Sequence, residues 1–153
     1  MEDLSLHVLD IVENSIRAGA TEIKIELFED PEADILRIDI ADNGKGMDEQ
    51  TVRNALDPFF TSKPDKRVGL GIPLFFQAAR EGGGAFDLQS KLLGGTKISA
   101  SFRLSHPDRK PTGDMDGTVQ LLKFTHPDIS FSYTCNRIEV KERSYETETG
   151  RSR

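Results

Sequence analysis

A stripe of polar side chains lies along one face of the first predicted helix. Residues 3–18 are predicted to be helical because four apolar side chains and one serine recur at helical spacing. These residues are Leu4, Val8, Ile11, Val12 and Ser15. At about 100° per residue, the opposite side holds Asp3, His7, Asp10, Asn14 and Arg17. A solvated helix face is the simplest interpretation. However, Asn is a poor residue for a helix interior, and an acid, an amide and a base together could hold a metal ion and phosphates.

A glycine-rich turn with the sequence DNGKGM, residues 42–47, directly follows a predicted strand. Asn-Gly is a strong signal for a β-hairpin, but residues 47–56 do not alternate as a returning strand would, and they look helical. We therefore favour a turn whose glycines, Gly44 and Gly46, let a ligand approach the backbone. The carboxylate of Asp42 would then lie at the end of the strand.

A second glycine-rich segment, Gly69-Leu70-Gly71, opens another predicted helix and follows the sequence PFFTSK, residues 58–63. Free backbone N–H groups and the helix dipole make such a helix start suitable for binding phosphate. Adjacent phenylalanines, Phe59 and Phe60, at the mouth of a polar loop are unusual, and core positions beneath the loop are the simplest interpretation of them.

These motifs need a framework of strands and helices to position them. Alternation at period two predicts strands over residues 21–28 and 34–40, with a further strand pair over residues 86–91 and 96–103. Short helices are expected over 48–56 and 70–80, with a Pro/Lys-rich loop over 57–68 between them. The expected organisation is a domain over 1–104, a polar linker over 105–117, a C-terminal β-hairpin extension over 118–141 built from strands 118–124 and 129–133, and a disordered tail over 142–153.

Composition excludes several classes of protein. No apolar run approaches the roughly 20 residues of a membrane span, and the acidic, amphipathic N-terminus does not resemble a signal peptide. The net charge of −6 argues against a nucleic-acid surface. Cys135 is the single cysteine, which fits a reducing cytosol, and it is expected to be a small apolar residue of a strand. We therefore expect a cytoplasmic protein with neither nucleic acid nor membrane as partner.

Five segments resemble, in order, the characteristic boxes of the GHKL superfamily of histidine-kinase-like ATPases. HVLDIVENSIRAGAT resembles its N box, DNGKGM its first glycine box, PFFTSK its F box and VGLGIPLF its second glycine box. GGGAFDLQSKLLGGTKISASF resembles the closing strand pair that carries the Gly-Thr of the superfamily. Each box alone is weak, but the ordered set, which covers about residues 4–104, is specific.

The resemblance implies the Bergerat fold, an α+β fold in which a two-layer sandwich has a mixed, mostly antiparallel sheet with helices on one face. It implies ATP and Mg²⁺ as ligands. Asp42 would accept a hydrogen bond from the adenine amino group, where guanine offers an acceptor, and Asn14 would give its amide oxygen to Mg²⁺. Thr96 would lie near Asp42 and the base, and Arg17 would contact phosphate. The other ATP-binding residues carried over from the boxes are Gly44, Gly46, Met47, Phe60, Lys63, Gly69, Leu70 and Gly71.

Asp10 occupies the place where ATP-hydrolysing members of the superfamily carry Glu. Asp is one methylene shorter, and a general base must reach its water within roughly 2.6–3.2 Å. The chain also contains no segment resembling the helical module that carries a phosphoacceptor histidine. We therefore expect a Mg-ATP-binding regulatory protein in signal transduction, acting as a protein kinase in trans on a separate, unidentified partner, with Asp10 as its catalytic residue. The alternatives are a non-catalytic, ATP-gated binding module of the anti-sigma type and a slow ATPase switch.

Overall fold

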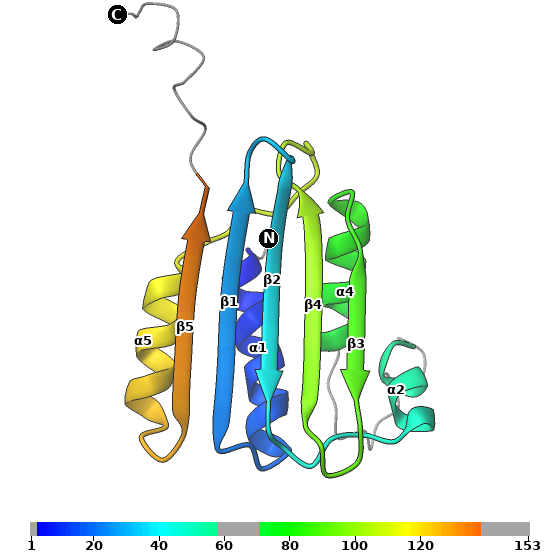
Figure 1. Cartoon of the computed structure of the whole chain (residues 1–153), viewed down its shortest axis with the longest axis vertical. Helices are drawn as coiled ribbons and strands as arrows, with labels where there is room; N and C mark the ends of the chain where they lie inside the picture. Colours follow the sequence, from blue (N-terminus) through cyan, green and yellow to red (C-terminus); the bar gives the residue numbers. More distant parts are fainter. Residues whose placement is uncertain (1–2, 58–70, 139–153) are drawn as a thin grey trace, which may run out of the picture.

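The computed structural model describes residues 3–57 and 71–138 (Figure 1). Its helices are α1 (Leu4–Arg17), α2 (Glu49–Ala55), α4 (Gly71–Glu81) and α5 (Met115–Thr125). Its strands are β1 (Glu22–Asp30), β2 (Ile35–Asp42), β3 (Phe86–Ser90), β4 (Thr96–Arg103) and β5 (Ser130–Arg137). The predicted loop over 57–68 falls outside the described residues except for Asp57, and the predicted tail over 142–153 lies wholly outside them. Within the described ranges no helix is both long and apolar enough to cross a bilayer.

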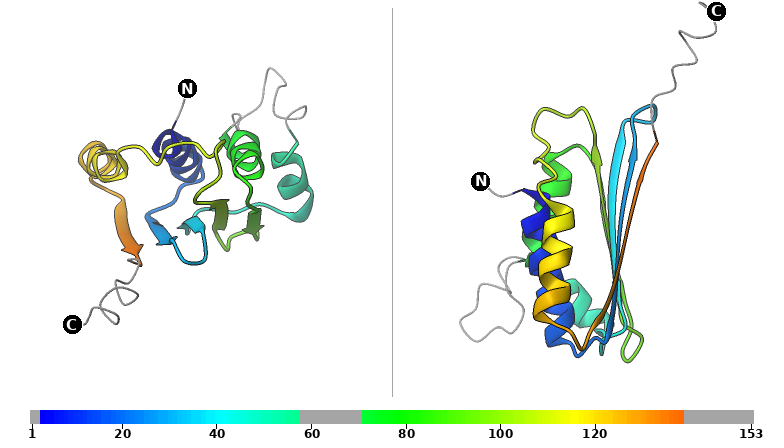
Figure 2. Two further views of the ribbon diagram at one scale, coloured as in Figure 1. Left: turned by 90° about the horizontal axis from the view of Figure 1, so that it is seen from above. Right: turned by 90° about the vertical axis from the view of Figure 1, so that its left-hand side faces the viewer.

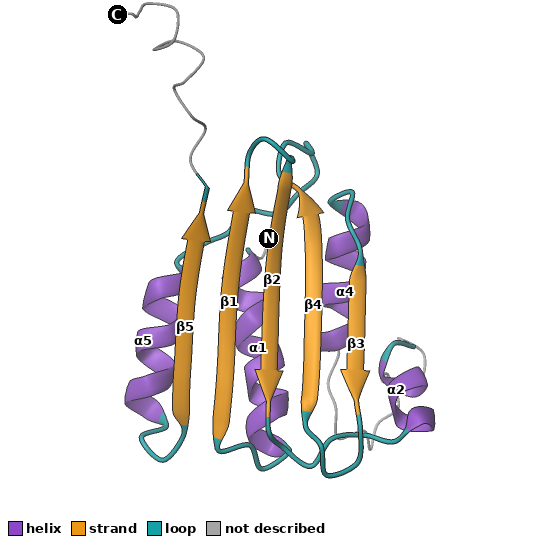
Figure 3. Ribbon diagram, viewed as in Figure 1, coloured by secondary structure: helices purple, strands orange, loops and turns teal. Residues whose placement is uncertain are grey.

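The five strands form one sheet in the order β3-β4-β2-β1-β5. β1 with β2, β2 with β4, and β3 with β4 pair antiparallel, whereas β5 runs parallel to β1. Figures 2 and 3 show α1, α4 and α5 together on one face of this sheet. The predicted fold class, a two-layer sandwich with a mixed and mostly antiparallel sheet, is therefore confirmed.

The core lies between the sheet and its helices. Because side chains alternate across a strand, Leu36, Ile38 and Ile40 of β2 all face the helices, and each is at most 2% exposed. The apolar stripe predicted for α1 packs against this face. The same alternation places Asp42, at the end of β2, on the helix-covered face of the sheet.

The prediction of a β-hairpin within residues 118–141 is wrong. Its first half belongs to helix α5, where Met115, Val119 and Leu122 are buried at helical spacing. The helix begins after Asp114, whose side chain accepts a hydrogen bond from the Gly117 N–H. The second half is β5, which pairs with β1 and not with residues 118–124.

Cys135 lies in β5, so the prediction that it belongs to a strand is confirmed. Its side chain is nevertheless exposed, and it does not fill an apolar core position.

Candidate functional site

The carboxylate of Asp42 is held by two donors at the end of β2. Its Oδ2 accepts a hydrogen bond of 2.5 Å from the hydroxyl of Ser15 on α1, and its Oδ1 accepts one of 2.8 Å from the Gly44 N–H. Asp42 is half-buried. Each carboxylate oxygen can accept more than one hydrogen bond, so Asp42 keeps acceptor capacity for a ligand.

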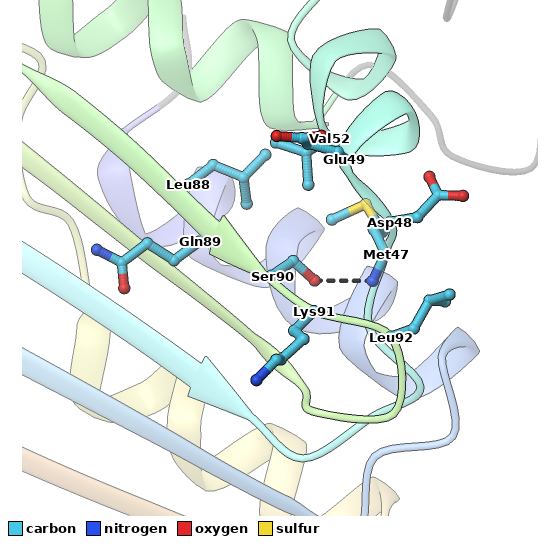
Figure 4. A pocket seen from close by; sticks show the side chains of 9 residues that line it. All are labelled: Met47, Asp48, Glu49, Val52, Leu88, Gln89, Ser90, Lys91 and Leu92. Atoms are coloured by element: carbon cyan, nitrogen blue, oxygen red, sulfur yellow. Dashed lines mark hydrogen bonds between the residues drawn. The ribbon is translucent and has the colours of Figure 1, made fainter.

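Thr96 lies directly opposite Asp42, because the β2–β4 register pairs these two residues. The Thr96 hydroxyl is 2.7 Å from the hydroxyl of Ser90, which also donates to the Gly95 carbonyl and accepts from the Met47 N–H at 2.8 Å. Figure 4 shows this last bond joining the end of β3 to the glycine-rich turn. Ser90 therefore fixes the turn relative to Thr96.

The glycine-rich turn, residues 42–47, packs closely against its neighbours. Gly46 has φ +71°, and a Cβ on it would overlap the carbonyl of Lys91 in the β3–β4 turn. A Cβ on Gly44 would lie 3.0 Å from the Cβ of Ala18 and 3.1 Å from Oδ1 of Asp42. The packing of the protein itself therefore leaves no room for a side chain at Gly46 and little at Gly44, and close approach of a ligand to these two glycines stays a prediction.

Two hollows adjoin this turn. One of about 350 Å³ has Asp42 and Thr96 in its lining. The other, of about 480 Å³, lies between α2 and the end of β3, with Met47, Val52 and Leu88 in its lining (Figure 4). Ligand pockets commonly have volumes of about 300–1,000 Å³. The lining of the smaller hollow also includes Ala41, Gln89 and Lys97, which lie on the face of the sheet away from the helices. Leu88 and Ser90 of the larger hollow share the helix-covered face with Asp42 and Thr96. The larger hollow is therefore the one on the same face of the sheet as the Asp42 side chain.

The polar stripe of α1 is not a uniformly solvated face. His7 is 3% exposed and its ring stacks on Phe75 of α4, with 5.5 Å between ring centroids. Further along, α4 begins against the same stripe, since a Cβ on Gly71 would lie 3.2 Å from the Cβ of Asp10 and 3.8 Å from Nδ2 of Asn14. The side chains of Asp10 and Arg17 are exposed.

Asn14 has one end of its amide satisfied and the other not. Its Oδ1 accepts a hydrogen bond from the Arg17 guanidinium, whereas its Nδ2 is buried and has no hydrogen-bond partner among the residues described. A buried donor without a partner costs about 1–3 kcal/mol, so this position is suited to a ligand that brings acceptors. Phosphate oxygens would satisfy the N–H₂ group, and the amide oxygen is of the type that Mg²⁺ takes as a ligand. The residues present therefore fit a magnesium nucleotide.

The structure thus brings the described candidates together in two groups. Asp42, Gly44, Gly46, Met47 and Thr96 lie around the end of β2, and Asp10, Asn14, Arg17 and Gly71 lie where α1 meets α4. Phe60, Lys63, Gly69 and Leu70 are outside the described residues.

Sequence reasoning missed Ser15 and Ser90 as members of the site. The sequence pattern places Ser15 in the apolar stripe of the helix, where a hydroxyl adds nothing to apolar packing. That mismatch, directly after Asn14, is the signal that could have identified it. We find no comparable signal for Ser90.

The family model described as "Histidine kinase-, DNA gyrase B-, and HSP90-like ATPase" matches residues 2–106, which is more than half of the chain. The chain therefore belongs to this family of ATPases. The resemblance that the sequence boxes indicated is confirmed, and membership implies ATP binding.

Individual relatives agree with this family. The chain is 43% identical over 56 residues, 37% of its length, to "Sensor protein kinase FleS" of Pseudomonas aeruginosa. It is 44% identical over 63 residues, 41% of its length, to "DNA mismatch repair protein MutL" of Streptococcus sanguinis. These matches span only 14% and 9% of the two relatives.

The chain is also similar to the solved structure "Aquifex aeolicus MutL ATPase domain complexed with ADP". The superposed region includes 97% of this chain and 70% of the chain in that structure. The TM-score is 0.52 at 17% identity, and this likeness establishes the fold alone.

Proposed function

We propose that the chain binds Mg-ATP with its adenine at Asp42 and acts in the cytoplasm as a protein kinase of the histidine-kinase type on a separate protein. The observation that carries the proposal is the half-buried Asp42 carboxylate, which lies opposite Thr96 and beside the helix that bears Asn14. Relatives named as sensor kinases support the kinase assignment.

Asp42 would select the base. A carboxylate is an acceptor only, so it can pair with the amino group of adenine but not with the carbonyl that guanine presents at the same place. Thr96 would contribute a second polar contact from the neighbouring strand. The proposal therefore requires a preference for ATP over GTP.

The junction of α1 and α4 would receive the phosphates. Asn14 would hold Mg²⁺ through its amide oxygen, and Arg17, now hydrogen-bonded to that oxygen, would turn to phosphate. When bound, Mg²⁺ supplies positive charge that neutralises the phosphates. The start of α4 at Gly71 adds the positive end of a helix dipole.

Asp10 would act on the acceptor side chain of the partner protein. It lies on the same stripe of α1 as Asn14, one turn earlier, and its carboxylate is exposed. A serine, threonine or histidine side chain brought by the partner would replace water as the acceptor of the phosphoryl group. Asp10 would orient that group and accept its proton as the phosphoryl group moves to it.

The test uses radiolabelled ATP. The pure protein should release phosphate very slowly and should not label itself, whereas addition of cell extract should give a labelled protein. Asp10→Asn should keep ATP affinity within about twofold and lose the transfer. Rapid turnover by the pure protein, or stable self-labelling that His7→Ala abolishes, would refute the kinase-in-trans assignment.

A slow ATPase switch is the second candidate, and the likeness to MutL is the observation that favours it. The same assay separates the two. The switch would be identified by two results together. The pure protein would release phosphate and Asp10→Asn would abolish that release, and no labelled protein would form in the extract.

A further inference from the structure

The hydroxyl of Ser15 lies in a part of α1 that is otherwise committed to the core. Ser15 is 3% exposed, and Val8, Ile11 and Val12 are its neighbours on the buried side of the helix. Burial of a hydroxyl without a partner is unfavourable, so its partner matters. That partner is Oδ2 of Asp42, 27 residues away in the chain, at 2.5 Å.

From this geometry we infer that Ser15 is a positioning residue for adenine recognition. The inference rests on the proposed binding of ATP. Ser15 donates to one oxygen of Asp42 while the Gly44 N–H donates to the other. Two donors on two oxygens fix both the direction and the rotation of the carboxylate. The acceptor positions that remain for a base are therefore set before the ligand arrives.

Without the Ser15 hydroxyl, the carboxylate of Asp42 could rotate, and its Oδ2 could accept a hydrogen bond from water. Ordering a side chain on binding costs about 0.5–1.5 kcal/mol, which corresponds to about two- to twelvefold in affinity. We therefore expect Ser15→Ala to weaken ATP binding by about two- to twelvefold. Binding of ribose 5′-triphosphate, which lacks a base, should not change, and GTP binding should not weaken. The ATP:GTP preference should fall by the same factor as ATP affinity.

The helix provides a matched control. Ser5, also on α1 and 4% exposed, donates its hydroxyl to Oδ1 of Asp3 at 2.6 Å. Ser5→Ala removes the same chemical contact from the same helix, at its opposite end. It should change the melting temperature by a similar amount and leave the affinities for all three ligands unchanged.

Calorimetric titration of the wild type, Ser15→Ala and Ser5→Ala with ATP, GTP and ribose 5′-triphosphate tests the inference. A selective loss of ATP affinity in Ser15→Ala supports it. Two results overturn it: unchanged ATP affinity in Ser15→Ala, or an equal loss for ATP and for the triphosphate without a base, which would mean a general structural effect. A wild-type protein with no preference for ATP would instead remove the proposed function itself.

Discussion

Replacement of Asp42 by Asn exchanges one carboxylate oxygen for an N–H₂ group at almost constant size. The Gly44 N–H needs an acceptor, so the amide oxygen should take the position of Oδ1. The Ser15 hydroxyl can reverse its direction and accept from the new N–H₂ group at the position of Oδ2. The variant should therefore fold, and its defect should be confined to the ligand.

The size of the defect follows from the change in acceptor. A hydrogen bond to a charged group contributes about 1.5–3 kcal/mol and one to a neutral group about 0.5–1.5 kcal/mol. If the adenine amino group also meets the new N–H₂ group, two donors oppose each other, and the total loss reaches about 3 kcal/mol. ATP affinity should therefore fall about 5- to 150-fold. The carbonyl of guanine could now find a donor, so the preference for ATP over GTP should narrow.

Calorimetry with Mg-ATP and Mg-GTP measures both quantities, and Asp39→Asn is the matched control. Asp39 is on the same strand but on the opposite face of the sheet, and its carboxylate accepts from the Ser99 hydroxyl at 2.6 Å and from Arg37. Its replacement should lower stability and leave nucleotide affinity unchanged. Equal affinity of the wild type for ATP and GTP, or an unaffected Asp42→Asn, would refute the assignment of the adenine carboxylate.

Asn14→Ala should weaken ATP binding much more in Mg²⁺ than in EDTA, because it removes the proposed metal ligand and leaves the proposed base contacts. Equal losses of affinity in the two buffers would exclude Asn14 as a magnesium ligand. Gly46→Ala should destabilise the fold by at least about 2 kcal/mol in chemical denaturation, since it adds a clash with backbone to a left-handed conformation. Gly19→Ala is its control, because Gly19 has φ +80° but open space around it, and its cost should be smaller. Asp34→Asn should lower the melting temperature near pH 7, because hydrogen bonds from Ser105 hold the pKa of Asp34 below its usual 3.8. This contribution is present above that unfolded value and is lost as the pH falls through the lower, folded pKa, so the two proteins should converge in acid.

The C-terminal part of the fold could not be predicted by the pattern that served elsewhere. In residues 118–124, TVQLLKF, the β-branched and aromatic residues suggested a strand. The helical evidence begins earlier, with the cap at Asp114 and the buried Met115, in a stretch that looked like a polar linker. A parallel strand also has no short-range signal, because its partner β1 lies about a hundred residues away and is reached through a helix.

The placement of the candidate residues relative to one another could be predicted better than the contacts that support them. The sequence boxes pointed to Asp42 and Thr96, and the β2–β4 register places them opposite each other. Sequence periodicity could not reveal that His7 faces α4, because a polar residue at helical spacing is equally compatible with solvent. The hydroxyls of Ser15 and Ser90 depend on which elements meet in space, and that is decided by packing between distant segments.

Two consecutive residues of α1 face different parts of the candidate site. The step of about 100° between neighbours in a helix turns Ser15 toward the end of β2 and Asn14 toward the start of α4. One rigid helix therefore contacts the carboxylate proposed to bind the base and carries the amide proposed to bind the metal and phosphates. If α1 moved as a unit, the contacts at both ends of a bound nucleotide would change, and the affinities for the base and for the phosphates would change together. Substitutions at the two positions should instead separate them. Asn14→Ala should act through the metal and Ser15→Ala through the base, and this contrast distinguishes local contacts from displacement of the whole helix.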